Sequence, residues 1–291
     1  MHGICYNTGQ RSNWSEHGML YDIDLVGKIG SMALIRPEDY DINYNILSRI
    51  CAELRPGMVW VTSGATEIGR LDHMKRTGKE LPPGEESKAD YASQGQAILM
   101  ANYRQFLRPE YGMRQLLVEH QHFNDAEKRE HIRRLLLRAA EQQTIPIVNY
   151  NDPVSDEENR KMELAALRES GQGVHECVDN DETAAVIAGI VRARTLLILT
   201  STEGIYLDHK DPSTLVEKVS AASPDLLEKK IRDLQSHCHG ASRAGANGAY
   251  AKLEYVLGTA LKGTTVCIGH ARHRLSDILS GAVPHTRIGL C

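Results

Sequence analysis

The sequence predicts an α/β fold in which a mainly parallel sheet lies between two layers of helices, a three-layer α/β/α sandwich. Short apolar runs rich in Val, Ile and Leu alternate with longer segments of helical spacing along the chain. The short runs are apolar on both faces, which is typical of strands that helices cover on both sides. A hydrophobic content of 41% over 291 residues supplies enough apolar surface for a sizeable core and excludes general disorder.

The apolar runs and the helical segments define the predicted elements in chain order. Strands are expected at residues 23–26, 58–61, 116–118, 145–148, 196–199 and 265–268. Helices are expected at residues 42–54, 91–107, 126–142, 181–194, 226–235 and 250–261. A break near residues 191–194 divides one sheet into two lobes, residues 1–190 and 191–291, and the whole chain is expected to form a single domain.

Charge and hydropathy exclude several classes of protein. Lys and Arg number 34 against 38 Asp and Glu, a formal net charge of −4, and no long basic run is available to neutralise a nucleic-acid backbone. No stretch approaches the roughly 20 apolar residues that span a bilayer, and the N-terminus lacks the apolar core of a signal peptide. We therefore expect a cytoplasmic protein with no nucleic-acid partner and no membrane partner.

The six cysteines are scattered, without the close paired spacings of a disulfide framework or a zinc ribbon. Reduced thiols are expected. His237, Cys238 and His239 suggest a soft-metal site, but adjacent residues cannot all turn toward one tetrahedral centre. No metal held by protein ligands is predicted.

Small and hydrogen-bonding residues follow four of the predicted strands. The four segments are Gly27-Lys28-Ile29-Gly30-Ser31, Thr62-Ser63-Gly64-Ala65, Asn149-Tyr150-Asn151-Asp152 and Thr200-Ser201-Thr202-Glu203-Gly204. The carboxyl ends of parallel strands meet at one edge of a sheet, and ligands bind there. The sequence therefore predicts a binding site at this edge.

Two of the glycine-rich segments carry a lysine suited to a phosphate group. Lys28 stands beside two glycines that would let a phosphate approach backbone amides, although the order of a Walker A loop is absent. Residues 244–253 form a second small-residue loop that runs into a helix containing Lys252, and a helix N-terminus attracts anions. The alternatives are a solvated turn at Lys28 and a flexible loop before an ordinary amphipathic helix at Lys252.

Two acidic segments have both a structural and a functional reading. One residue of Asp179-Asn180-Asp181 is expected to cap the helix that follows, and a spare carboxylate could hold the two lysines in register. Asn149, Asn151 and Asp152 could be turn-formers before a proline, or could recognise an ammonium and a carboxylate group.

Taken in order, these segments resemble the amino acid kinase family, and within it the glutamate 5-kinases most closely. The resemblance covers the chain from about residue 23 to residue 286. Further matches are the Gly95-Gln96 helix, the Glu203-Gly204-Ile205-Tyr206 segment and the glycine-rich loop at 245–252.

The resemblance implies transfer of a phosphoryl group from ATP to the side-chain carboxylate of glutamate or a related small amino acid. Mg²⁺ would bridge ATP oxygens rather than sit in a protein cage. Lys28 and Lys252 would be catalytic by neutralising the transferring oxygens, and Asp181 would hold both. The implied phosphate and nucleotide contacts are Gly30, Ser31, Gly64, Thr200, Ser201, Asn247 and Gly248. The implied acceptor contacts are Ser63, Ala65, Asn149, Asp152 and Asn180. The expected partners are a small amino acid or carboxylate acceptor and further copies of the chain.

Three features depart from the family pattern. We expect no RNA-modification-type domain, which many glutamate 5-kinases carry, after the last kinase element. Ser201 stands where the family usually has Asp. Asp152 and Asn180 are 180 − 152 = 28 positions apart, and residues 155–170 predict an extra helix beside the acceptor site.

Because of the longer connection, the sequence does not identify the acceptor substrate. Two other functions stay possible at this point. One is a family kinase with a phosphate-bearing acceptor, whose acceptor loops would carry additional Arg or His. The other is a non-catalytic nucleotide-binding protein on the same fold.

Overall fold

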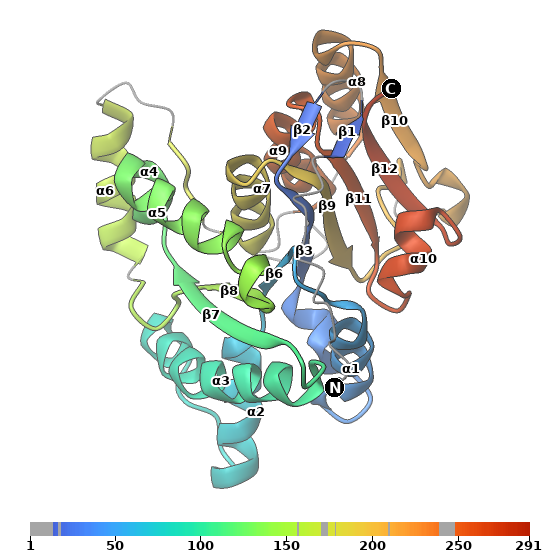
Figure 1. The fold of residues 1–291 in the computed structure, drawn as a ribbon. Helices are drawn as coiled ribbons and strands as arrows, with labels where there is room; N and C mark the ends of the chain where they lie inside the picture. The colour runs from blue at the N-terminus through green and yellow to red at the C-terminus, as the bar shows by residue number, and fades with distance from the viewer. Residues whose placement is uncertain are drawn as a thin grey trace, which may run out of the picture.

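A central eight-stranded sheet organises the protein (Figure 1). The computed structural model describes residues 14–16, 19–155, 157–169, 174–177, 179–208, 210–238 and 248–291. The strand order is β10-β12-β11-β9-β3-β6-β8-β7. Six neighbouring strands run parallel, whereas β12 pairs antiparallel with β11 and parallel with β10. The predicted α/β/α sandwich with a mainly parallel sheet is confirmed.

The strands of the sheet come from both halves of the chain. The first half supplies β3 (Ile23–Ile29), β6 (Met58–Thr62), β7 (Gly112–Val118) and β8 (Thr144–Tyr150). The second half supplies β9 (Ala193–Thr200), β10 (Lys218–Ala221), β11 (Thr265–His270) and β12 (His285–Leu290). Because β3 and β9 are neighbours, the two halves join in the middle of one sheet.

Helices cover both faces of the sheet. One face packs against α1 (Tyr44–Glu53), α2 (Ala65–Thr77), α3 (Glu85–Phe106) and α10 (Leu275–Ser280). The other face packs against α5 (Ala126–Leu137), α7 (Asn180–Ile190), α8 (Pro224–His237) and α9 (Ala249–Leu261). Side chains alternate between the two cores along a strand, since Val26 belongs to one and Leu25 to the other.

The remaining elements are short, apart from the helix of the long connection. They are β1 (Trp14–Glu16), β2 (Met19–Tyr21), β4 (Ile35–Arg36), β5 (Asp41–Ile42), α4 (Gln121–Asn124) and the 3₁₀ turns η1 (Ser31–Leu34), η2 (Ala140–Gln142) and η3 (Pro212–Thr214). The extra helix predicted at residues 155–170 is α6 (Glu157–Glu169). No helix in the described ranges combines the length and the apolar character needed to cross a membrane.

Two sequence predictions need correction. The helix expected at residues 181–194 ends at Ile190, because Arg192 adopts a φ of 45° and Ala193 begins β9. Gly27 and Lys28 lie inside β3 rather than in a loop after it. A Cβ at Gly27 would come within 2.1 Å of the ring of Trp60, so this glycine makes room for a buried tryptophan instead of a phosphate.

Candidate active site

Three charged side chains meet at the carboxyl-terminal edge of the sheet. Lys28 near the end of β3 places Nζ 2.5 Å from Oδ1 of Asp181, and Lys252 in α9 places Nζ 3.0 Å from Oδ2 of the same carboxylate. Asp181 is 1% exposed and Lys28 is 7% exposed. One buried carboxylate therefore fixes two ammonium groups that the chain supplies 224 residues apart (252 − 28 = 224).

The local sequence around Asp181 explains why its carboxylate is available to the lysines. Asp179, not Asp181, is the N-cap of α7, and its side chain accepts a hydrogen bond from the Asp181 backbone N–H at 2.8 Å. Capping uses the first acidic residue of the segment. The second one projects from the first turn of the helix toward Lys28 and Lys252.

The two aspartates have opposite electrostatic surroundings. Burial alone would raise the pKa of the Asp181 carboxyl, but the adjacent charges of Lys28 and Lys252 outweigh it and hold that pKa below its usual value. Burial and the nearby charge of Asp181 raise the pKa of Asp179. Asp181 is therefore the ionised centre of this cluster.

Two glycines follow the strands of the site, and one of them lies beside Lys28. A Cβ at Gly30 would lie 3.5 Å from the Nζ of Lys28, where a bound group could otherwise contact the ammonium. Gly64 is the N-cap of α2 with a φ of 102°, a conformation that L side chains rarely adopt. A turn at Gly64 thus follows β6 and begins α2, near Ser31 and Leu34.

A chain of side-chain amides crosses the acceptor side of the site. Asn180 donates to Oγ of Ser63 at 3.0 Å and to Oδ1 of Asn149 at 3.2 Å, and Asn149 donates to Oε1 of Gln96 at 2.8 Å. Within the described residues, Oδ1 of Asn180 and Nε2 of Gln96 are buried without a hydrogen-bond partner. Buried polar atoms are usually paired. The Asn180 oxygen could therefore accept a hydrogen bond from a ligand, and the Gln96 nitrogen could donate one.

Asp152 is a largely buried carboxyl group on the loop after β8. Burial raises the pKa of its carboxyl to about 6, and the charge of Arg160 opposes that shift. Among the residues that the structure describes, no cation forms an ion pair with Asp152. A ligand ammonium would therefore find a carboxylate without an ion-pair partner here.

The extra helix α6 is anchored beside this loop. Oε2 of Glu163 lies 2.8 Å from Nε2 of the buried His120, and Leu164 is buried. Arg160 donates to Oγ of Ser155 at 3.4 Å. The long connection therefore brings the charge of an arginine near Asp152.

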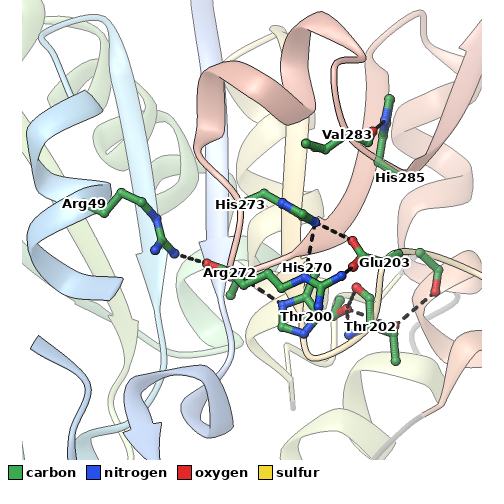
Figure 2. Close-up of polar contacts among 11 residues, drawn as sticks. Arg49, Thr200, Thr202, Glu203, His270, Arg272, His273, Val283 and His285 are labelled. Atoms are coloured by element: carbon green, nitrogen blue, oxygen red, sulfur yellow. Dashed lines mark hydrogen bonds and ion pairs between the residues drawn. The ribbon is translucent and has the colours of Figure 1, made fainter. Parts of the chain in front are cut away.

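A polar cluster occupies the same edge of the sheet at the ends of β9 and β11 (Figure 2). Glu203 accepts from Arg272, and its Oε2 lies 2.7 Å from Nε2 of His273. Arg49 reaches from α1 to the carbonyl oxygen of Ala271 in the same loop. These contacts join the end of β9 to the loop after β11.

The predicted nucleotide contacts differ in their surroundings. The Thr200 hydroxyl accepts from the Thr202 N–H at 3.0 Å and so organises the turn after β9. Ser201 is exposed. Gly248 is the N-cap of α9, and Ser31 begins η1 beside Gly30. Asn247 lies outside the described residues.

Sequence reasoning placed Glu203 at this edge of the sheet but did not predict its contacts with Arg272 and His273, nor the contact of Gln96 with Asn149. Gln96 was visible only as part of a family motif on α3, and its contact with Asn149 arises from helix-to-sheet packing. Ala65, a predicted acceptor contact, is buried at the start of α2. A Cβ at Gly95 would come 1.8 Å from the Ala65 carbonyl oxygen, so α2 and α3 pack at backbone distance there.

The described residues include no cluster of three or more His, Cys, Asp and Glu that could hold a metal ion. Asp181 is engaged by two lysines, and Asp179 is engaged by the backbone of α7. Cys51, Cys177, Cys238, Cys267 and Cys291 are free thiols.

Comparison with known proteins identifies related chains. The sequence profile of the amino acid kinase family matches residues 25–270. The glutamate 5-kinase of Gloeobacter violaceus is 30% identical over 281 residues, which cover 92% of this chain and 69% of the relative. The glutamate 5-kinase of Geobacillus thermodenitrificans is 28% identical, with 91% and 67% covered. That of Bacillus subtilis is 29% identical, and the match covers 58% of its length.

Solved structures share the fold at lower identity. The carbamate kinase of Giardia lamblia bound to AMP-PNP superposes with a TM-score of 0.57 at 15% identity, covering 92% of this chain and 98% of the other. A protein from Aeropyrum pernix superposes with a TM-score of 0.54, also at 15% identity.

Proposed function

The chain belongs to the amino acid kinase family, and from this premise we propose that it transfers the γ-phosphoryl group of ATP to the side-chain carboxylate of glutamate or a related small amino acid. The observation that carries the proposal is the buried carboxylate of Asp181 between the ammonium groups of Lys28 and Lys252. A protein that only bound a nucleotide would not need two fixed charges at one point beside an acceptor pocket.

The reaction needs little covalent work from the protein. An oxygen of the acceptor carboxylate attacks the γ-phosphorus, a new O–P bond forms, and the bond to the β-phosphate oxygen breaks. The products are an acyl phosphate and ADP. No general base is required, since the acceptor carboxylate is already ionised at neutral pH. Phosphoryl transfer of this kind depends on positioning and on charge neutralisation.

The two lysines supply that neutralisation in this proposal. Charge spreads over the transferring oxygens in the transition state, and two ammonium groups held by Asp181 meet it without reorganisation. Mg²⁺ bound to the phosphates would add positive charge there. The described carboxylates at this centre are already engaged, so the phosphate oxygens of ATP would provide most of its ligands.

The acceptor amino acid fits the polar groups that line the other side of the site. Its ammonium would lie between the carboxylate of Asp152 and the free Oδ1 of Asn180, while the free Nε2 of Gln96 would donate to a carboxylate. Ser63, Asn149 and Ala65 would complete the pocket. On the donor side, Gly30, Gly64 and the α9 terminus at Gly248 would support the phosphates, while Thr200 and Ser201 would lie near the nucleotide.

One observation favours a second candidate. Arg160 on α6 acts electrostatically on Asp152, and an additional arginine beside the acceptor loop suits a phosphate-bearing acceptor. Asp152 itself favours an acceptor with an ammonium group, because a carboxylate repels a phosphate.

The discriminating experiment is a panel of acceptors incubated with MgATP and hydroxylamine, which traps an acyl phosphate as a coloured hydroxamate. We expect hydroxamate formation with glutamate or a close relative. ADP release with a nucleoside monophosphate or another phosphate ester, without hydroxamate, would favour the second candidate. If no carboxylate and no phosphate ester in the panel stimulated ADP release, both candidate functions would be refuted.

The remaining expectations follow from the proposed reaction. The protein would act in the cytoplasm, assemble as a homo-oligomer and serve amino-acid biosynthesis, proline biosynthesis in the case of glutamate.

A further inference from the structure

A cavity of about 260 Å³ lies at the opposite edge of the sheet from the lysines. Its walls come from the amino-terminal parts of β3, β6, β9 and β11, together with β12 and α10. Leu25, Met58 and Leu279 contribute apolar atoms to its lining. Both halves of the chain contribute, since Met58 belongs to the first half and Leu279 to the second.

The charged residues of the cavity are strongly unbalanced. Three arginines, Arg55, Arg194 and Arg287, line it together with a single carboxylate, that of Asp24. Their formal charges sum to +2. An excess of two positive charges around one concave space attracts anions and repels cations.

The single carboxylate organises two of the three guanidinium groups. Oδ2 of Asp24 lies 3.4 Å from Nη2 of Arg55, and its Oδ1 lies 3.9 Å from Nη2 of Arg194. Asp24 therefore holds both arginines at the cavity wall. Neither contact is a short bidentate pair, and Arg55 keeps donors for a ligand.

Arg287 completes the set from the neighbouring strand β12. Within the described ranges of the chain, no acidic side chain forms an ion pair with it. Its strand partner is Cys267 of β11. Cys267 and Arg287 both line the cavity. Burial raises the pKa of the Cys267 thiol to about 11, and the nearby charge of Arg287 opposes that shift.

The size and the apolar lining of the cavity restrict the class of ligand further. Sites for drug-sized molecules begin at about 300 Å³, so a volume of about 260 Å³ suits a smaller molecule. A bare, strongly hydrated ion would gain nothing from Leu25, Met58 and Leu279. A short carbon skeleton would bury apolar surface against them.

We infer that this cavity is a second binding site, separate from the catalytic edge, for a small organic dianion such as a dicarboxylate or a phosphate monoester. Guanidinium groups match the geometry of both anions through paired N–H donors. The ligand would contact residues from both halves of the sheet. Its binding does not depend on the proposed reaction, so the site can be tested in the absence of activity.

The test is calorimetric titration of the full chain with glutarate, glycerol 3-phosphate and inorganic phosphate, with MgAMP-PNP present to occupy the nucleotide side of the catalytic edge. Arg287→Ala is compared with Arg138→Ala. Arg138 is an exposed arginine at the end of α5, remote from the cavity, and its loss changes the net charge equally. Arg287 is exposed as well, so its replacement should leave the fold intact.

We expect glutarate or glycerol 3-phosphate to bind, with an affinity at least tenfold weaker in Arg287→Ala and within twofold of the original in Arg138→Ala. Glutarate alone would identify a dicarboxylate site, and glycerol 3-phosphate alone a phosphate-ester site. Equal affinities in the two variants, or binding of inorganic phosphate only, would overturn the inference. A crystal soaked with the bound probe should show it between the three guanidinium groups, and density only beside Lys28 would likewise overturn it.

Discussion

Replacing Lys28 by Met tests the role of the lysine pair in most detail. The variant removes one of the two ammonium groups on Asp181 and keeps a side chain of similar length. Lys252 remains 3.0 Å from the carboxylate, so Asp181 stays paired and the fold should persist. The change therefore acts on the charge available to the transferring phosphoryl group.

The magnitude follows from the position of the Lys28 ammonium group. The Lys28 residue is 7% exposed, so solvent screens its charge poorly. Two unit charges about 4 Å apart interact by about 4 kcal/mol at an effective dielectric constant of about 20. Loss of one preorganised donor to a transition-state charge typically costs about 2.7–4 kcal/mol, a factor of about 10² to 10³ in kcat. Because Lys252 remains, we expect the lower end, roughly a hundredfold.

Steady-state ADP release, coupled to NADH oxidation, measures kcat and the KM of each substrate. We expect kcat to fall roughly a hundredfold while the KM of the acceptor changes little, since the interaction is made mainly in the transition state. Lys218→Met, at an exposed position on β10, is the matched control and should retain full activity. A folded variant whose kcat stays within threefold, or which loses only acceptor affinity, would refute the role assigned to Lys28.

Three further predictions concern the acceptor pocket and the packing beneath it. Below pH 6 the acceptor kcat/KM should fall about tenfold per pH unit, because the carboxyl of Asp152, with a pKa of about 6, must be ionised to bind an ammonium. The Asp152→Asn variant should be inactive or should lack this fall at acidic pH. A pH profile of kcat/KM that is unchanged in the variant would exclude Asp152 as the titrating group. Shortening residues 153–178 to a brief turn should leave ATP affinity unchanged and alter relative acceptor kcat/KM values at least about tenfold. Unchanged relative kcat/KM values across the acceptors would show that α6 does not shape the acceptor pocket. Gly95→Ala should lower the free energy of unfolding by about 1–3 kcal/mol or more in urea titrations, since its Cβ would meet the Ala65 carbonyl at 1.8 Å. Gly258→Ala, in open space within α9, should raise the free energy of unfolding by about 0.5–1 kcal/mol. Equal effects of the two substitutions would contradict the close backbone packing of α2 against α3.

The fold was predictable where the physics is local. All six expected strands lie in the sheet, because runs such as residues 196–199 are apolar on both faces and belong to two cores at once. Helix α2 and the strands β10 and β12 were not predicted. Helix α2 is polar and contains Gly69, and its place depends on backbone contact with α3, which no pattern within its own sequence reports.

The candidate site was predictable in part from single segments. The expected edge of the sheet could be inferred from the residues after the strands, since parallel strands end on one side. Which aspartate caps α7 could not be read from the order Asp179-Asn180-Asp181, because both ends of that segment satisfy a capping preference. Tertiary contacts settle it, since Lys28 and Lys252 converge on Asp181.

Two features of the site required the folded chain. Gln96 lies in the middle of a helix, and only packing against β8 brings it to Asn149. Glu203 meets Arg272 and His273 across about 70 residues of sequence, a distance over which no spacing rule applies. Gly27 shows the reverse case, because its proximity to Lys28 suggested a phosphate loop whereas the tryptophan beside it explains the glycine.

The central claim is that a carboxylate oxygen of the acceptor becomes bonded to the γ-phosphorus of ATP. The most direct measurement uses the acceptor chosen by the hydroxamate panel, labelled with ¹⁸O in its side-chain carboxylate, with MgATP and hydroxylamine. Hydroxylamine attacks the acyl carbon, so the phosphate leaves with the bridging oxygen. The account predicts one ¹⁸O in each released phosphate, seen as the isotope shift in the ³¹P spectrum. Phosphate without the label would mean that water, not the carboxylate, had attacked phosphorus, and would contradict the account.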